Sequence, residues 1–336
     1  MGLLRRVARA AFFVFFSVAV PVASGADGGI GVDDGLHFIN VLRAYDVMAP
    51  AYKPYSGSGI WLRPMLWNGD SHLKNGCSAE GSGRGLSAGC CLSTAKLAII
   101  PLAASLDIFA SKRDGSFERK DDKSIGADGK ADGLGGSVSA HLMGLDLRAV
   151  AYYERVRSEE RGCSANDIKN DAFHLGAYLS QKLIPLGPIG AGPELAVITT
   201  RLSSAEAEIR QVAGKATNFF RSAWSSATSW HVAPGLFVSF NGGGRSACRI
   251  CGRWNWDFGH KPTVREFVPT SGDDAGIAAS INSIRSQVKW PKSGYGDLEI
   301  AFCIGLGKTM FAEASVTANS VNRRGVCAAL TVGKGF

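Results

Sequence analysis

Long hydrophobic runs are scarce in this sequence of 336 residues. Beyond residue 26, no apolar stretch reaches the roughly 18 residues that a transmembrane helix needs. Yet 46% of the residues are hydrophobic and 42 are glycine. The apolar residues must therefore be dispersed, and alternating strands are one pattern that hides them from a hydropathy window.

Catalytic and metal-binding motifs are also missing. The only CxxC is Cys248–Cys251, so a zinc ribbon would lack half its ligands, and no βαβ pattern surrounds it. A calcium loop starting at Asp128 would place Lys130 third and Ser139 twelfth, which breaks the EF-hand spacing. No nucleophile–base pair surrounds any of the six histidines. They are His37, His72, His141, His174, His231 and His260. We expect neither an enzyme nor a bound metal or cofactor.

Signals for nucleotides and nucleic acids are equally weak. The segment Gly305–Thr309 resembles the end of a phosphate-binding loop, but Phe302 stands where the first glycine is required. No basic cluster interleaved with aromatic residues is present, so we expect no nucleic-acid partner.

The N-terminus has the pattern of a secretory signal peptide. Arg5, Arg6 and Arg9 precede the apolar run Ala10–Val20, and small residues at 24–26 offer a cleavage site. A membrane anchor is the alternative, but the run is too short to span a bilayer. We predict that residues 1–26 are removed, which lowers the formal charge from +8 to +5 because three arginines are lost.

The exported chain would keep all eight cysteines, Cys77, Cys90, Cys91, Cys163, Cys248, Cys251, Cys303 and Cys327. An even number in an exported chain permits disulfides, although the pairing cannot be read from the sequence. We name Cys77, Cys90, Cys91 and Cys163 as disulfide candidates.

Apolar residues recur at every second position in eleven segments of the remaining chain, which predicts β-strands. The alternating segments are 96–111, 138–154, 173–183, 195–201, 232–240, 248–258, 298–306, 310–319 and 326–336, with weaker candidates at 36–45 and 59–67. Glycine-rich or charged segments between them are interpreted as loops: 68–90, 112–136, 155–170 and 259–296.

One segment has helical periodicity instead. Ser203 and Glu206 fit a capping box, and Ile209, Val212 and Phe220 recur at helical spacing. We predict a short amphipathic helix at 203–224, either folded into a barrel or across its mouth, or an ordinary surface helix. A second helix is suggested near residues 277–288.

The last strand carries the most specific pattern. Val326, Ala328, Leu330 and Val332 alternate with small or polar residues, and the chain stops at Phe336. This resembles the terminal strand of Gram-negative outer-membrane β-barrel proteins, although Lys334 departs from the preferred apolar residue. The resemblance implies recognition of this strand by the barrel-assembly machinery. From the alternation alone, a water-soluble sheet is the alternative.

The resemblance implies one outer-membrane domain, residues 27–336, forming an all-β, antiparallel transmembrane barrel of about ten strands, within a range of 8–12. Its lumen-facing polar candidates are Asp146, Arg148, Glu154, Lys182, Arg249, Arg253, Asp257, Glu299 and Glu313. The expected function is a small porin-like channel for passive diffusion in outer-membrane lipid. The alternative is a non-conducting surface barrel whose long loops adhere to host or partner molecules.

Overall fold

The computed structural model describes residues 43–48, 58–72, 78–93, 102–123, 126–142, 144–161, 168–213, 216–242, 246–258, 264–272, 284–287, 294–307 and 309–335. The chain divides into two compact units, Met1–Ile30 and Gly31–Phe336, and all described residues lie in the second. The predicted signal peptide therefore lies outside the described residues.

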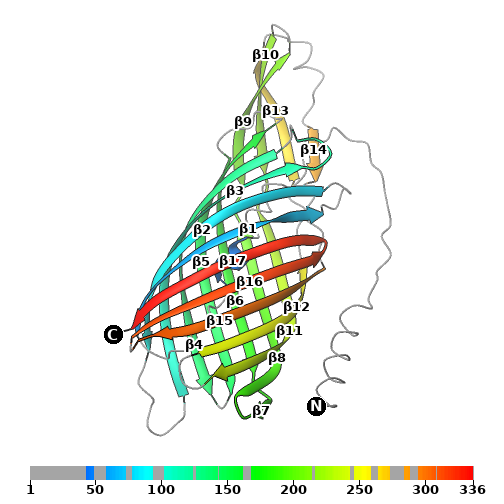
Figure 1. The fold of residues 1–336 in the computed structure, drawn as a ribbon. Helices are drawn as coiled ribbons and strands as arrows, with labels where there is room; N and C mark the ends of the chain where they lie inside the picture. The colour runs from blue at the N-terminus through cyan, green and yellow to red at the C-terminus, as the bar shows by residue number, and fades with distance from the viewer. Residues whose placement is uncertain are drawn as a thin grey trace. The chain divides into compact units, whose positions relative to one another are not determined.

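Twelve antiparallel strands form a closed barrel (Figure 1). They are β1 (Gly59–His72), β2 (Ser78–Ser93), β3 (Leu102–Arg119), β4 (Gly126–Leu142), β5 (Leu145–Arg161), β6 (Ile168–Gln181), β8 (Ile189–Leu202), β11 (Ala227–Gly242), β12 (Ser246–Phe258), β15 (Tyr295–Leu306), β16 (Met310–Val321) and β17 (Arg323–Gly335). Each pairs with its neighbour in this order, and a short strand, β7 (Ile184–Leu186), pairs with β8.

Pairing of the first strand with the last closes the ring. Gly59 lies opposite Gly335, and the register continues to Ser71 opposite Arg323. The pairing of β8 with β11 completes the circle. The closed antiparallel barrel is confirmed, but the estimate of ten strands is wrong because the barrel has twelve.

The missing strands were concealed in segments interpreted as loops. β2 occupies most of 68–90, and β3 and β4 extend through 112–136 except for the turn between them. Likewise, β5 runs to Arg161 and β6 begins at Ile168. These portions have polar or charged residues on the outer face and glycine at many inner positions, so no hydrophobic alternation marks them as strands.

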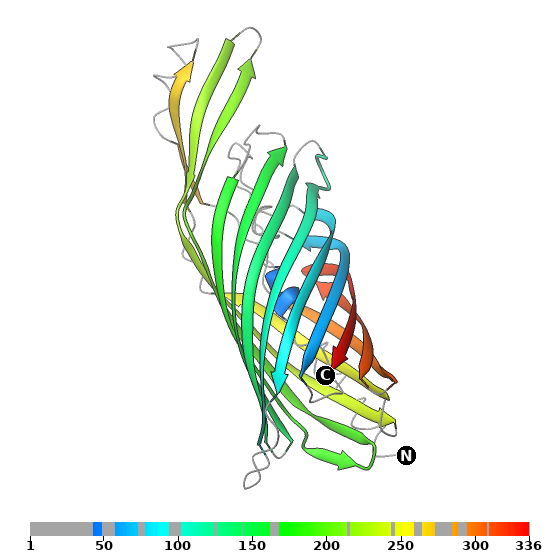
Figure 2. The same cartoon turned by 90° about the vertical axis from the view of Figure 1, so that its left-hand side faces the viewer.

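The predicted helix at 203–224 is also wrong. A hairpin forms there from β9 (Ala205–Ala213) and β10 (Ala216–Trp224), in continuous antiparallel register. With β13 (Val264–Gly272) and β14 (Ile284–Gln287) it makes a separate four-stranded sheet. The helix suggested near residues 277–288 is wrong at residues 284–287, because these form the strand β14. Figure 2 shows β9 and β10 continuing from the barrel strands. The pairing of β9 with β10 overrides the local helical preference of this segment.

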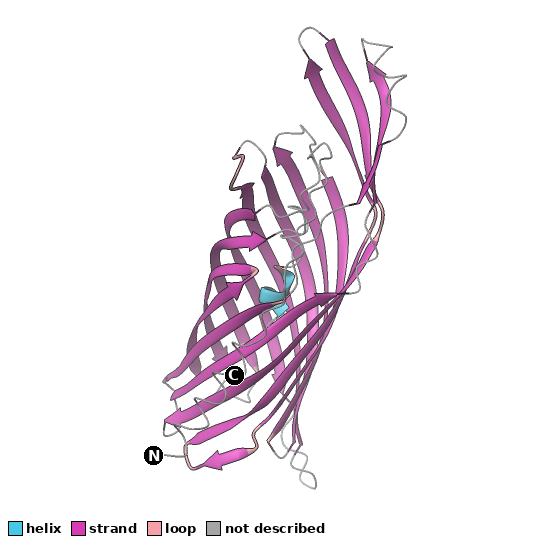
Figure 3. Ribbon diagram, turned by 90° about the vertical axis from the view of Figure 1, so that its right-hand side faces the viewer, coloured by secondary structure: helices cyan, strands magenta, loops and turns pink. Residues whose placement is uncertain are grey.

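The N-terminal part of the described chain is a helix rather than a strand. α3 (Ala44–Met48) covers the end of the segment 36–45 that we predicted as a strand, while residues 36–42 lie outside the described residues. Figure 3 shows this helix enclosed by barrel strands. Four of its five residues are buried, so the helix is part of the barrel's core.

The outer face of the barrel is an apolar belt. Alternate side chains of each strand point outward, and large apolar ones are exposed on every wall strand. Examples are Leu62, Leu86, Ile108, Leu134, Leu175, Leu195, Val238, Ile250, Ile300, Val316 and Leu330. In the terminal strand Val326 and Leu330 are 44% and 46% exposed, whereas Phe336 lies outside the described residues. This arrangement matches the lipid-facing surface of a transmembrane barrel.

Helices do not provide a membrane span in the described part of the chain: none there is both long enough and apolar enough to cross a bilayer.

Inside the wall, large aromatic rings lie over glycines of neighbouring strands. A Cβ atom added to Gly133 would lie 2.6 Å from Cε2 of Tyr152, and one added to Gly135 would lie 2.5 Å from Cζ of Phe109. Such separations are far inside van der Waals contact. The glycines of β4 therefore leave the space that the interior rings fill.

Replacing Gly133 by alanine is expected to lower the free energy of unfolding by about 1–3 kcal/mol, the usual cost of overpacking. The cause is that Tyr152, hydrogen-bonded to Ser111, must move. Gly252→Ala is the matched control, because an added Cβ there meets no atom within 4 Å. Urea titration in micelles, followed by heat-modifiable migration, measures both. Equal losses for the two variants would contradict the steric explanation.

Candidate functional site: a filled barrel interior

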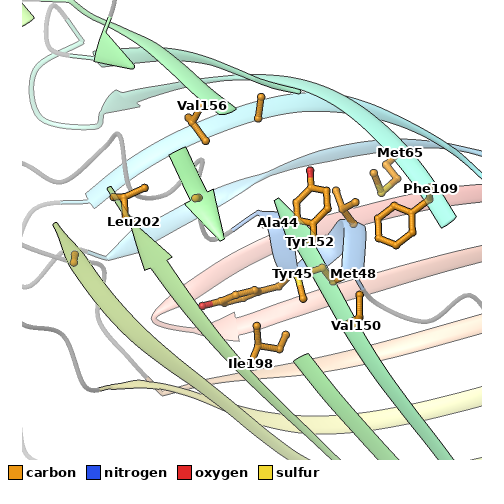
Figure 4. Packing of buried hydrophobic residues seen from close by; sticks show 14 of the residues in the cluster. Ala44, Tyr45, Met48, Met65, Phe109, Val150, Tyr152, Val156, Ile198 and Leu202 are labelled. Atoms are coloured by element: carbon orange, nitrogen blue, oxygen red, sulfur yellow. The ribbon is translucent and has the colours of Figure 1, made fainter. Parts of the chain in front are cut away.

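The barrel interior is occupied by α3 and by the inner side chains of the wall. Ala44, Tyr45, Val47 and Met48 belong to one buried apolar cluster with residues from β1, β3, β4, β5, β6, β8, β9 and β11. Figure 4 shows Tyr45 and Met48 close to Val150 and Ile198, with Phe109 and Tyr152 above them. Strands from opposite sides of the barrel thus meet through this one short helix.

Specific contacts hold α3 in place. Arg148 of β5 donates a hydrogen bond of 3.1 Å from Nη1 to the carbonyl oxygen of Met48. The Tyr45 ring lies 4.4 Å, centre to centre, from the ring of His231 on β11. Arg43, just before the helix, lies over the ring of Trp67 at 4.4 Å. Both ends of α3 and its middle are therefore attached to the wall.

A fully buried charge network lies on β3, β5 and β6. Arg113 Nη2 donates to both carboxylate oxygens of Glu154, at 2.5 and 2.6 Å. The same carboxylate accepts from the hydroxyl of Tyr152 at 3.1 Å and lies 3.3 Å from Nε2 of His174. His174 in turn lies 2.8 Å from the hydroxyl of Thr200. The glutamate is 0% exposed, so its charge is balanced within the protein.

A second network joins β8, β12 and β15. Arg253 donates to Glu194 and, at 2.5 Å, to Glu299, and its Nη1 lies 3.6 Å from Asp297. Arg249 also donates to Glu194. Cysteine adds a further contact, since Sγ of Cys251 donates to Glu194 at 2.6 Å. Two arginines therefore face three carboxylates on this side of the interior.

The other candidate lumen residues have different surroundings. Asp257 is buried and lies 2.9 Å from Nδ1 of His231, beside α3. Glu313 is 2% exposed on the inner face of β16. Asp146 is exposed near the start of β5, 2.5 Å from Nδ1 of His141. Lys182 lies one residue beyond the end of β6. The structure thus brings together Arg249, Arg253 and Glu299, but not Asp146 or Lys182.

Sequence reasoning missed the partners that complete both networks. Arg113 falls in a segment interpreted as a loop, and Glu194 precedes the predicted strand 195–201. His174 was recognised only as a histidine without a catalytic partner. Extending the two-residue alternation outward from the predicted strands would have placed Arg113 and Glu194 on the inner face. Their partners, however, lie 41 and at least 55 residues away, and only strand pairing identifies them.

The cysteines follow the alternation of the wall. Cys90 is exposed, whereas Cys91 is buried, because neighbouring residues of β2 point to opposite faces. The CxxC likewise has Cys251 buried and Cys248 partly buried. Cys77 and Cys163 lie outside the described residues. Within the described ranges, no group of three or more His, Cys, Asp or Glu side chains is arranged to hold a metal ion.

Sequence comparisons identify no family. No family model matches the chain, and no curated protein matches it by sequence.

Solved structures do share the fold. The translocator domain of the autotransporter NalP from Neisseria meningitidis aligns with a TM-score of 0.59 and 11% identity, over 89% of this chain and 95% of that one. The β domain of the Bordetella autotransporter BrkA aligns with a TM-score of 0.54 and 14% identity, over 83% of this chain and 100% of that one. An outer-membrane channel from Pseudomonas putida F1 aligns with a TM-score of 0.50 and 9% identity, over 86% of this chain and 97% of that one.

At these identities the likeness concerns the fold alone. The closed ring, the outward apolar belt and the polar interior agree with it independently. The chain therefore has the fold of Gram-negative outer-membrane β-barrel proteins, and no single family within that class is distinguished.

Proposed function

We propose that this protein is an integral outer-membrane barrel that acts as a small channel for passive diffusion and is closed at rest by α3. The observation that carries the proposal is the position of this helix, buried among residues from opposite sides of the wall. Outer-membrane lipid contacts the apolar belt, and the barrel-assembly machinery recognises the terminal strand β17. One solved structure with this fold is an outer-membrane channel.

A five-residue helix suits a removable plug. It is too short to be stable by itself in water, so its structure depends on contacts with the wall. Those contacts are made by side chains: a hydrogen bond from Arg148, a ring contact with His231 and the packing of the buried side chains of the helix. Wall strands pair with one another and not with α3, so moving the helix would leave the ring of strands intact. The mixed charges around it would line a polar path.

Planar-bilayer recording of the full-length protein tests the plug. Wild type is expected to open rarely, and Tyr45→Ala/Met48→Ala to raise the open fraction at least tenfold, because both changes remove plug contacts and leave the wall intact. Leu62→Ala, on the lipid-facing side of β1, is the control and should behave like wild type. A steadily open wild-type channel would show that α3 does not obstruct diffusion.

If neither wild type nor the plug variant conducts ions, the better proposal is a non-conducting surface barrel that acts in adhesion. The second sheet favours this alternative. Its strands lie in the connections β8–β11 and β12–β15, at the rim opposite the C-terminus, where they would be presented outside the cell if the C-terminus is periplasmic. Binding of the refolded protein to host cells, compared with a variant in which residues 205–224 are replaced by a short turn, would test adhesion.

A further inference from the structure

The outer wall of β2–β6 carries charged residues beyond the apolar belt. The highest apolar row runs across four strands through Ala110, Leu134, Tyr153 and Phe173, which lie opposite one another. The next outward row consists of Lys112, Asp132, Arg155 and Asp171. Its charges alternate in sign, and it forms ion pairs of 3.9 Å (Lys112–Asp132) and 3.4 Å (Arg155–Asp171). We call it the paired row.

The row above it breaks this alternation. Lys130 of β4 lies opposite Arg157 of β5, which lies opposite Lys169 of β6, and all three side chains are exposed. We call these three residues the basic row. Like charges directly opposite one another destabilise a sheet. Within the described residues, Lys130 and Arg157 have no carboxylate within ion-pair distance. An anion from outside the chain that lies between Lys130 and Arg157 would relieve this repulsion.

The neighbouring acids Asp114, Asp128 and Glu159 form no ion pair with Lys130 or Arg157. Asp114 lies beside Lys130 but accepts hydrogen bonds from Arg84, at 3.1 and 3.2 Å to its two oxygens. Asp128 and Glu159 lie opposite each other one row further from the belt. The basic row therefore separates the membrane side of the wall from these two acids.

A groove connects the basic row with the apolar belt. It has a volume of about 940 Å³ and crosses the backbone of Gly83, Gly115 and Gly129. Lys130 and Arg157 line one part, and the belt residues Leu66, Val326 and Ala328 line another. One continuous hollow thus offers cations and an apolar surface to an amphipathic anion. Asp114, which is bound by Arg84, and the outer acids Asp128 and Glu159 also line it.

The height of the row identifies the ligand class. The basic row is the second outward row above the apolar row, about 13 Å away along a strand and roughly 10 Å above the belt when the strand tilts. The polar zone of a bilayer is about 5–8 Å deep on each side. Long basic side chains reach back toward it. Arginine and lysine both bind phosphate strongly.

We infer that this groove binds a phosphate-bearing membrane lipid, with its phosphate at Lys130 and Arg157 and an acyl chain along Leu66, Val326 and Ala328. The inference does not depend on whether the lumen conducts. It gives the barrel a fixed lipid partner at one side of its wall, on strands β1–β5 and β17.

Native mass spectrometry of the full-length barrel in neutral detergent tests the site. The probes are dioleoyl phosphatidic acid, dioleoylglycerol with the same chains but no phosphate, and inorganic phosphate. Wild type is expected to retain phosphatidic acid at least fivefold better than Lys130→Gln/Arg157→Gln, and to show no such difference for dioleoylglycerol. Raising the salt concentration should weaken retention of phosphatidic acid, because the contact is exposed.

The matched control is Lys112→Gln/Arg155→Gln, which removes the same charge from the paired row and should change retention less than twofold. Equal losses in the two double variants would overturn the site, because general charge would then explain binding. Retention of inorganic phosphate as strong as that of the lipid would also overturn it, since the apolar part of the groove would contribute nothing. Heat-modifiable migration of each variant confirms that the barrel is folded.

Discussion

Glu154→Gln is expected to lower the free energy of unfolding by about 3–5 kcal/mol, the usual loss when one member of a buried ion pair is removed. The variant keeps the shape of the side chain but leaves the guanidinium of Arg113, 7% exposed, without its carboxylate. Tyr152 and His174 also lose their charged partner. Urea titration in micelles, followed by heat-modifiable migration, measures the loss.

Removing the second charge should restore much of this stability. Arg113→Met/Glu154→Gln carries no buried charge at this position and is expected to be more stable than Glu154→Gln alone. Arg155→Met is the control, since Arg155 and Asp171 are 56% and 52% exposed and such pairs contribute about 1 kcal/mol or less. A double variant as unstable as the single one would show that hydrogen-bond geometry, not unbalanced charge, dominates the network.

Arg253→Met is expected to cost about 3 kcal/mol, toward the lower end of the range for buried pairs because Arg253 is 18% exposed. Its loss leaves Glu299 and Asp297 without the cation they share, and leaves Arg249 as the remaining cation beside Glu194. Three carboxylates then face one another across β8, β12 and β15. The same unfolding titration measures the effect.

Arg253→Lys separates charge from geometry at this position. Lysine keeps the positive charge but cannot donate to Glu194 and Glu299 in the fixed fork of a guanidinium. We expect it to recover about half of the loss. Lys112→Met is the exposed control, with both members of its ion pair more than 60% exposed. If Arg253→Lys is as unstable as Arg253→Met, the planar donor geometry is what the network requires.

The strand alternation of the sequence predicted most of the strands, and the resemblance of the terminal strand to outer-membrane proteins added the closed barrel. Segments such as 298–306 alternate large apolar residues with small or polar ones, and the structure places the apolar set outward. The pattern is informative because lipid and interior impose opposite requirements on adjacent residues. Where the outer face is charged, as at 112–119, that contrast disappears, and two strands were interpreted as a loop.

The inner chemistry was predictable only in part. Alternation selected Glu154 and Arg253 as inward residues, but it could not identify their partners Arg113 and Glu194 or the glycines under the aromatic rings. These choices depend on which strands are neighbours and in what register. A shift of the register by one residue would exchange the two faces of a strand, so the networks exist only in the assembled ring.

By itself the sequence determined the class of structure: alternation over many short segments requires a sheet whose two faces meet different environments, and the terminal strand indicates a membrane barrel. The tertiary structure decided the rest: twelve strands, a hairpin at 205–224 and a helix inside the lumen. The physical reason is the distance along the chain over which each feature is determined. Alternation is a local property of one strand, whereas ring size, charge partners and the position of α3 depend on contacts between residues far apart in the chain.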